Sequence, residues 1–134
     1  MPKPIVVDTY ALVKWINGEA GYSGYSEFLT SPSWQRIITP VTLCELKLAM
    51  LKKEAGLDEW VASLAFTKQI CEVRPLTESV MLRAAEIKFK YMAESKINLS
   101  MVDSICVSLA ESLDAPILTG DKGIKLVEEV RVLP

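Results

Sequence analysis

The chain of 134 residues is half hydrophobic and 24% charged, and it carries a net charge of −2. A chain of this length is large enough to bury a core without disulfides or structural metals, and its charge neither identifies nor excludes a nucleic-acid-binding protein. The sequence contains no histidine, which excludes His-dependent catalytic triads and His-based zinc sites.

Short apolar runs alternate with helical patterns along the chain. From the N-terminus, the sequence predicts a strand at 5–7, a helix with Leu12, Trp15 and Ile16 on one face, a short helix near 26–29, a strand at 36–39 ended by Pro40, and helices at 42–54 and 57–68. The pattern continues with a strand at 70–73, helices at 77–94 and 100–112, and strands at 116–119 and 130–133. Strands that alternate with helices form a parallel sheet with helices on both faces. We therefore predict one α/β domain over residues 1–134.

Four acidic residues occupy similar places in this pattern. Asp8 ends the first strand, and Asp121 lies just past the fourth strand. Glu45 and Asp103 lie in the first turns of the helices predicted at 42–54 and 100–112. Because ligands of an open parallel sheet bind beyond the carboxyl ends of its strands, we expect these four carboxylates at one edge of the sheet.

Each acid also has a purely structural explanation, because acidic and hydroxyl side chains cap helices. The alternatives are an N-cap role for Asp8 and for Asp121, a capping box formed by Thr42-x-x-Glu45, and a similar box formed by Ser100-x-x-Asp103. Capping does not explain why three of the four acids lack an adjacent cation. Only Asp121 is followed directly by one, Lys122.

A cluster of carboxylates on one edge favours a bound cation, because crowded carboxylates repel one another and raise one another's pKa. Oxygen ligands without Cys or His favour Mg²⁺ or Mn²⁺ over zinc. Such ions generate a hydroxide nucleophile and stabilise displacement at phosphorus, and this chemistry needs no histidine.

Three segments, VVDTYAL, TLCEL and LSMVDSICVSLAESLDAPILTGDKGI, carry these acids in order. Together they resemble the PIN domain, the fold of many small metal-dependent ribonucleases, and most of all the VapC-type toxins of VapBC toxin–antitoxin operons. The resemblance covers nearly the whole chain. It implies a three-layer α/β/α fold with a five-stranded parallel sheet in order 3-2-1-4-5, and Mg²⁺- or Mn²⁺-dependent endonucleolytic cleavage of RNA.

The resemblance also implies roles for the four acids. In such toxins the acids at the positions of Asp8 and Asp103 hold the metal. The acids at the positions of Glu45 and Asp121 complete the site directly or through water.

Neighbouring residues match the family in part. Thr9 and Thr119 match its hydroxyl residues, and we expect them to orient the carboxylates. Ile124 stands where the family often has an aromatic residue, which indicates a change in packing. Gly123 stands near Asp121, where the family often carries a further acid, so a second metal would be held weakly or recruited only with substrate.

Lysines near the acids are candidates for binding substrate phosphates, although each is otherwise an ordinary surface lysine. Lys122 is the best candidate because it adjoins Asp121. The others are Lys14, Lys47, Lys52, Lys53 and Lys125.

The resemblance further implies protein partners. In VapC-like proteins a helical hairpin, which here contains Val61, Leu64 and Phe66, forms a groove for an antitoxin segment, and homodimers are usual. We expect an RNA substrate, a cognate antitoxin and a homodimer. We expect no membrane association, because no segment reaches about 18 apolar residues.

Three cysteines bear on the location of the protein. Cys44, Cys71 and Cys106 lie in apolar segments without a CxxC pattern, and we expect them to be reduced core thiols of a cytoplasmic protein. Two alternative functions stay open: a non-catalytic PIN-like RNA-binding or assembly module, and a free-standing RNA-processing nuclease.

Overall fold

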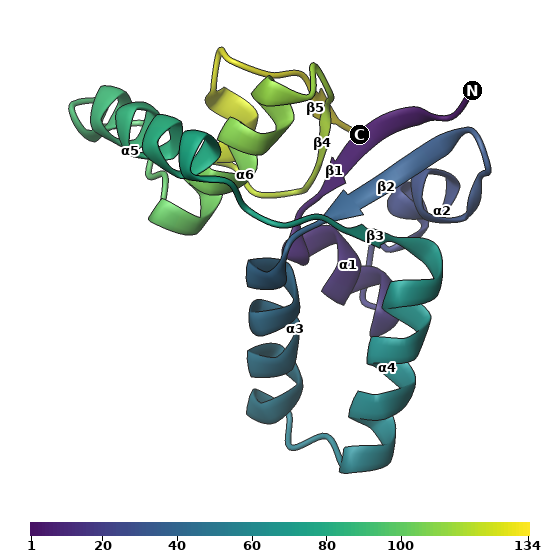
Figure 1. Cartoon of the computed structure of the whole chain (residues 1–134). Helices are drawn as coiled ribbons and strands as arrows, with labels where there is room; N and C mark the ends of the chain where they lie inside the picture. The colour runs from purple at the N-terminus through teal and green to yellow at the C-terminus, as the bar shows by residue number, and fades with distance from the viewer.

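The centre of the molecule is a five-stranded sheet in the order β3-β2-β1-β4-β5 (Figure 1). The computed structural model describes all 134 residues. The strands are β1 (Lys3–Val7), β2 (Trp34–Ile38), β3 (Glu72–Val73), β4 (Ile117–Leu118) and β5 (Val132–Leu133). Every neighbouring pair is parallel. The predicted fold class and strand order are thereby confirmed.

Six α-helices connect the strands, and all of them were expected from the sequence. They are α1 (Thr9–Ile16), α2 (Ser23–Thr30), α3 (Pro40–Lys52), α4 (Leu57–Ile70), α5 (Glu78–Met92) and α6 (Met101–Ser112), followed by a short 3₁₀ helix, η1 (Ile124–Leu126). None of the helices combines the length and the apolar character that crossing a membrane requires.

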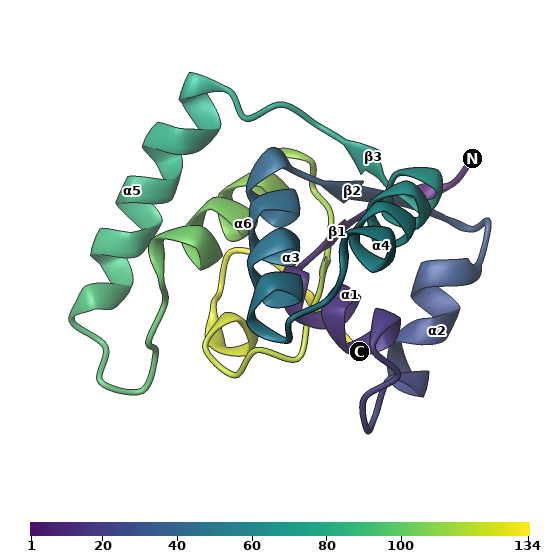
Figure 2. The same ribbon diagram turned by 90° about the horizontal axis from the view of Figure 1, so that it is seen from below.

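Helices cover both faces of the sheet because side chains of a strand alternate between faces. In β1, Ile5 and Val7 join an apolar cluster with residues of α1, α2 and α3. Val6 joins a second cluster with residues of α5 and α6. Figure 2 shows α5 beside α6 at one side of the molecule and α2 at the other. The result is the three-layer α/β/α arrangement.

The start of α3 differs from the prediction. Thr39 is the N-cap and Pro40 is the first helical residue, so the proline opens the helix. Proline is tolerated there because its missing N–H would be unpaired in any case. The capping box is formed by Thr39 and Thr42, and not by Thr42 and Glu45, so the structural alternative for Glu45 is wrong. Glu45 therefore lies in the second turn of α3.

The cysteines also differ in part from the expectation. None forms a disulfide, and Cys71 is buried, but Cys44 is exposed. Cys44 lies on the side of α3 opposite its buried residues Leu46 and Met50, so it is not a core thiol.

Candidate active site

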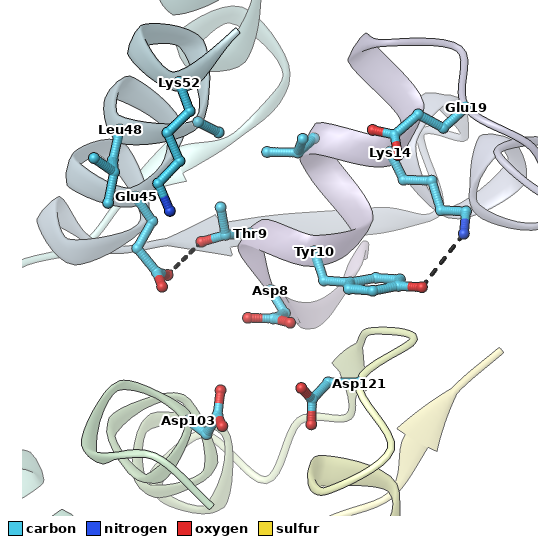
Figure 3. A pocket seen from close by; sticks show the side chains of 12 residues that line it. Asp8, Thr9, Tyr10, Lys14, Glu19, Glu45, Leu48, Lys52, Asp103 and Asp121 are labelled. Atoms are coloured by element: carbon cyan, nitrogen blue, oxygen red, sulfur yellow. Dashed lines mark hydrogen bonds between the residues drawn. The ribbon is translucent and has the colours of Figure 1, made fainter.

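A pocket of about 410 Å³ lies at the carboxyl ends of β1 and β4, between α1 and α3 (Figure 3). All four acids singled out in the sequence line it: Asp8, Glu45, Asp103 and Asp121. They come from four separate segments, which the parallel sheet brings to one edge.

Asp8 is the most deeply placed acid, with an exposed fraction of 8%. Its backbone N–H donates to the carbonyl of Leu118 at 3.0 Å, which fixes it at the centre of the sheet. The Thr119 hydroxyl donates to Asp8 Oδ2 at 2.7 Å. Asp8 occupies the N-cap position of α1, but its side chain makes no capping hydrogen bond. Capping therefore does not explain this carboxylate.

Thr119 connects Asp8 to Asp121. Its fully buried hydroxyl donates to Asp8 and accepts the backbone N–H of Asp121 at 3.0 Å. Asp121 Oδ1 in turn accepts the N–H groups of Gly123 at 2.8 Å and Ile124 at 3.0 Å. Asp121 is not the N-cap of η1, which is Gly123, but one of its oxygens holds the turn that leads into η1, while Oδ2 has no protein donor.

Glu45 and Asp103 are held in a similar way. The Thr9 hydroxyl donates to Glu45 Oε1 at 2.6 Å. Asp103 forms a capping box with Ser100: Asp103 Oδ2 accepts the Ser100 N–H at 3.1 Å, and the Asp103 N–H donates to Ser100 Oγ at 3.0 Å. Each acid thus uses one oxygen for a protein hydrogen bond and retains one without such a bond.

The electrostatics of the pocket are those of uncompensated acids. None of the four carboxylates forms a salt bridge. Burial, together with the nearby charges of Asp103, Glu45 and Asp121, raises the pKa of Asp8 to about 6, against a lowering by the Thr119 hydrogen bond. Burial also raises the pKa of Asp103. Bringing these groups together costs stability unless a cation joins them.

The carboxylates of the pocket suit a divalent ion that keeps several of its waters better than an ion that is enclosed entirely by protein ligands. No three acidic or thiol side chains lie close enough to hold an ion by themselves. Mg²⁺ keeps several of its waters and is usually bound through one or two carboxylates together with substrate phosphates. Four carboxylates, each with a free oxygen and no competing cation, suit Mg²⁺ or Mn²⁺ in that manner and do not suit zinc.

Three further residues of the pocket are not distinguished by the sequence patterns. Tyr10, Lys14 and Lys52 line the pocket, and Tyr10 was not singled out at all. Its spacing to Lys14, four residues along α1, was the signal available. Lys122 is exposed and does not line the pocket, so its contact with a phosphate stays a prediction.

Gly120, directly before Asp121, supports the site through its lack of a side chain. A Cβ at Gly120 would overlap the ring of Tyr10 and the hydroxyl of Tyr25. The two tyrosines therefore pack closely against the loop that carries Asp121.

The two departures from the family pattern also have structural reasons. A Cβ at Gly123 would lie 2.9 Å from the carbonyl oxygen of Asn98, so a further acid does not fit there unless the backbone shifts. Ile124 is fully buried in the cluster beneath α5 and α6, where it takes the place of the family's aromatic side chain as a packing residue.

The sheet order and the position of the pocket define an α/β protein whose acidic pocket lies where the strand order switches direction, the place where such sheets bind ligands. The PIN domain family model matches residues 5–130. The chain therefore belongs to the PIN domain family.

Solved structures with the same fold include several toxin–antitoxin proteins. VapBC2 from Rickettsia felis, bound to a DNA fragment from the promoter, has a TM-score of 0.76 and 18% identity over 96% of each chain. VapBC-1 from nontypeable Haemophilus influenzae has a TM-score of 0.74 and 14% identity over 96% of each chain. VapC20 of Mycobacterium tuberculosis, a Sarcin-Ricin loop cleaving toxin, has a TM-score of 0.69 and 19% identity over 95% of this chain and 98% of its own. At these identities the similarity shows the fold. No curated protein sequence matches the chain.

Proposed function

We propose that this protein, as a single domain over residues 1–134, is a Mg²⁺- or Mn²⁺-dependent endoribonuclease and the toxin of a type II toxin–antitoxin pair. The observation that carries the proposal is the pocket itself: four carboxylates without a cation partner, each with one oxygen free of protein donors. Membership of the PIN family supports it, as does the similarity to VapC20, which is described as a Sarcin-Ricin loop cleaving toxin.

The four acids have two different roles in this proposal. Asp8 and Asp103 hold the ion, and Glu45 and Asp121 complete its surroundings directly or through water. Thr119 holds Asp8 by donating to Oδ2, which leaves the opposite oxygen available to bind an ion. When bound, the ion supplies an activated water and neutralises charge on the phosphate during displacement.

The partners belong to the same proposal. An apolar groove of about 340 Å³ runs between α1 and α4 and is lined by Trp15, Ile16, Ala62, Ser63 and Phe66. On the same helix α4, Leu57 and Val61 are exposed, which suits an amphipathic antitoxin segment. We further propose a cytoplasmic homodimer that acts on RNA.

The test is cleavage of a labelled oligoribonucleotide by the purified protein with Mg²⁺, with Mn²⁺ and with EDTA. Asp103→Asn should lower metal-dependent cleavage at least about 10-fold, because changes even to groups that only support a metal ligand cost about 10–100-fold. The asparagine oxygen can still accept the Ser100 N–H, so the helix start is retained. Glu111→Gln, at an acid paired with Arg83, is the matched control and should cleave normally. Full activity in Asp103→Asn would end the nuclease proposal.

The two alternative functions are separated by other observations. A non-catalytic RNA-binding or assembly module would gain no stability from Mg²⁺ or Mn²⁺ in calorimetry, because its acids serve only as caps. A free-standing RNA-processing nuclease would lack a neighbouring reading frame for a short protein with a DNA-binding N-terminus.

A further inference from the structure

The groove above the acids has two walls that differ from its floor. The acids lie at the base, where β1 and β4 end (Figure 3). The walls are formed on one side by Tyr10, Val13 and Lys14 of α1 and on the other by Leu48, Ala49 and Lys52 of α3. The walls thus combine apolar side chains with one lysine each.

The two lysines occupy equivalent positions. Lys14 lies six residues after Asp8 and Lys52 lies seven residues after Glu45, so each backbone stands about 10 Å along its helix from an acid. Side chains of a helix lean towards its N-terminus, and both helices begin at the acid edge. Both lysine side chains line the pocket. Figure 3 shows the Lys52 ammonium beside Glu45 and the Lys14 ammonium at the Tyr10 hydroxyl.

Neither lysine is neutralised by the protein. Lys14 Nζ donates only to the Tyr10 hydroxyl, at 3.3 Å, and lies 5.2 Å from the centre of that ring. Lys52 forms no hydrogen bond and no salt bridge, although it shares a pocket with four carboxylates. By contrast, its neighbour Lys53 donates to Asn17 at 2.8 Å and lies 3.9 Å from Glu59.

The acids that line the pocket outnumber its lysines. Two lysines face five acids: Asp8, Glu19, Glu45, Asp103 and Asp121. A divalent ion at the floor would not by itself balance this excess of negative charge. The phosphates on either side of the scissile one would meet a negative pocket unless fixed cations receive them.

We infer that Lys14 and Lys52 form a two-sided clamp for the phosphates flanking the scissile one, so that a single RNA strand crosses from α1 to α3. The inference rests on the proposed function, since the strand must pass over the acid pocket. Tyr10 is a positioning residue, because its hydroxyl and ring hold Lys14 over the groove. Val13, Leu48 and Ala49 line the same pocket and would offer an unpaired base an apolar surface.

The test is the salt dependence of RNA binding, measured by fluorescence anisotropy. The starting protein, called the parent below, is the full chain with the substitution Asp103→Asn. Its binding to a labelled single-stranded oligoribonucleotide of about 12 nucleotides is measured in the presence of Mg²⁺. Lys14→Gln and Lys52→Gln should each reduce the slope of log K against log salt by about 0.7, the value for one lost phosphate contact on a single strand. Lys53 lies next to Lys52, so Lys53→Gln is the control and should leave the slope unchanged.

Steady-state cleavage by the protein with Asp103 intact gives a second measurement. Lys14→Gln and Lys52→Gln should raise KM and leave kcat unchanged, and Tyr10→Phe should raise KM less.

Each outcome decides something. Unchanged slopes in both pocket variants, or an equal loss in Lys53→Gln, would overturn the clamp while leaving the nuclease proposal intact. Reduced slopes in a protein that cleaves no RNA with any metal would support the clamp and overturn the nuclease. A parent that binds no RNA would overturn both.

Discussion

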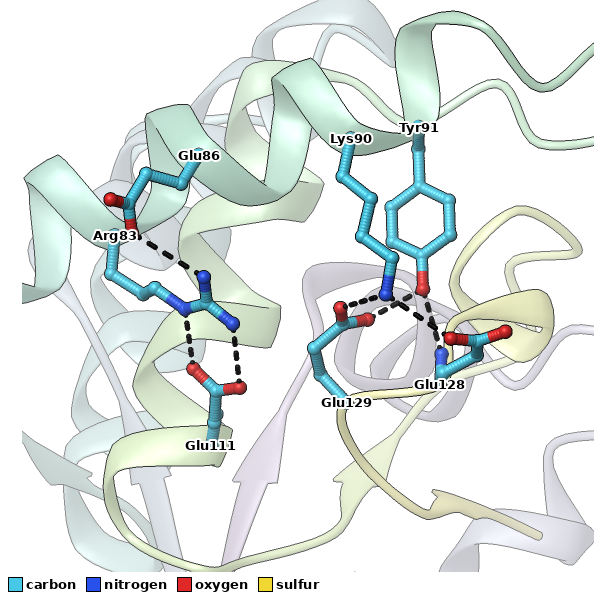
Figure 4. A network of polar contacts seen from close by, with 7 residues as sticks. All are labelled: Arg83, Glu86, Lys90, Tyr91, Glu111, Glu128 and Glu129. Atoms are coloured by element: carbon cyan, nitrogen blue, oxygen red, sulfur yellow. Dashed lines mark hydrogen bonds and ion pairs between the residues drawn. The ribbon is translucent and has the colours of Figure 1, made fainter.

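Two regions of the molecule gather acidic side chains and treat them in opposite ways. In the pocket, Asp8 and its three neighbours form no salt bridge, although Lys14 and Lys52 line the same pocket. Between α5, α6 and the C-terminal segment, the acids face cations instead (Figure 4). Arg83 donates from two nitrogens to both oxygens of Glu111, at 2.8 and 3.1 Å. Lys90 lies 3.1 Å from Glu128 and 2.8 Å from Glu129.

The pKa values of the acids differ between the two regions in the same sense. The hydrogen bonds of Arg83 lower the pKa of Glu111. Burial alone would raise the pKa of Glu129, but hydrogen bonds from Lys90 and Tyr91 outweigh it and lower that pKa. The pKa of Asp8 rises to about 6. The network neutralises itself and ties the C-terminal segment to α5, whereas the pocket leaves its charge for a ligand from outside.

The largest expected effect is on stability without metal. Asp8→Asn should raise the free energy of unfolding at pH 7 by up to about 3 kcal/mol, because a pKa near 6 instead of 3.8 penalises the charged form by 1.36 kcal/mol per unit. Metal-free wild-type protein loses this stability as the pH rises from about 4 through 6, so the advantage of the variant should vanish below pH 4. Urea unfolding in EDTA across this range measures it.

The matched substitution in the network should behave oppositely. Glu111→Gln removes a carboxyl whose pKa is lowered by Arg83, so it should destabilise the protein at pH 7 and lose this effect as the pH falls. If both variants changed stability with the same sign, the contrast between the two regions would be wrong.

Metal should act on the pocket alone. At 100 times its dissociation constant, Mg²⁺ should stabilise the wild-type protein by about 2.7 kcal/mol, as measured by calorimetry. The gain should fade below pH 6, because protons compete for Asp8. Glu111→Gln should keep the gain and Asp8→Asn should lose most of it. An equal gain in Asp8→Asn would place the ion elsewhere.

The network should depend on its buried hydroxyl. Tyr91 is 4% exposed. Its hydroxyl donates to Glu129 at 2.6 Å and accepts the Glu128 N–H at 2.9 Å. Tyr91→Phe should cost about 1–3 kcal/mol of unfolding free energy, since it leaves buried polar groups unpaired. Tyr10→Phe, at a tyrosine with 43% exposure, is the control and should change stability by less than about 0.5 kcal/mol.

The smallest effect is expected at the surface of the network. Arg83 is 43% exposed, so Arg83→Gln should cost less than about 1 kcal/mol despite its two-pronged contact. The loss should shrink further at high salt, because exposed charges are screened. A larger loss that salt does not alter would mean that the pair with Glu111 is effectively buried.

The sequence was sufficient for the sheet and for the acids at its edge. Strand ends are readable from short apolar runs, and Asp8 and Asp121 follow such runs directly. The start of α3 was misjudged because Pro40 both ends a strand and opens a helix, and only the contacts of Thr39 decide between them. Glu45 therefore lies in the second turn of α3 and not in the first, but it lines the pocket in either case.

Other features depend on contacts that a sequence pattern does not record. The direction of a lysine side chain follows from the exact start of its helix, so Lys14 and Lys52 could not be separated from Lys122. Lys90 and Glu129 meet across 39 positions of the chain, and no local pattern joins them. Tyr10 needed the position of Gly120 to show that it packs beside the acids.

The backbone bond between Asp8 and Leu118 has a consequence for the motions of the protein. β1 is the middle strand of the sheet, so the Asp8 amide belongs to the part of the fold that opens last. Its hydrogen should exchange with solvent only when the whole domain unfolds. A partner seated on α1 and α4 could therefore loosen the surrounding helices while the central acid stays in place.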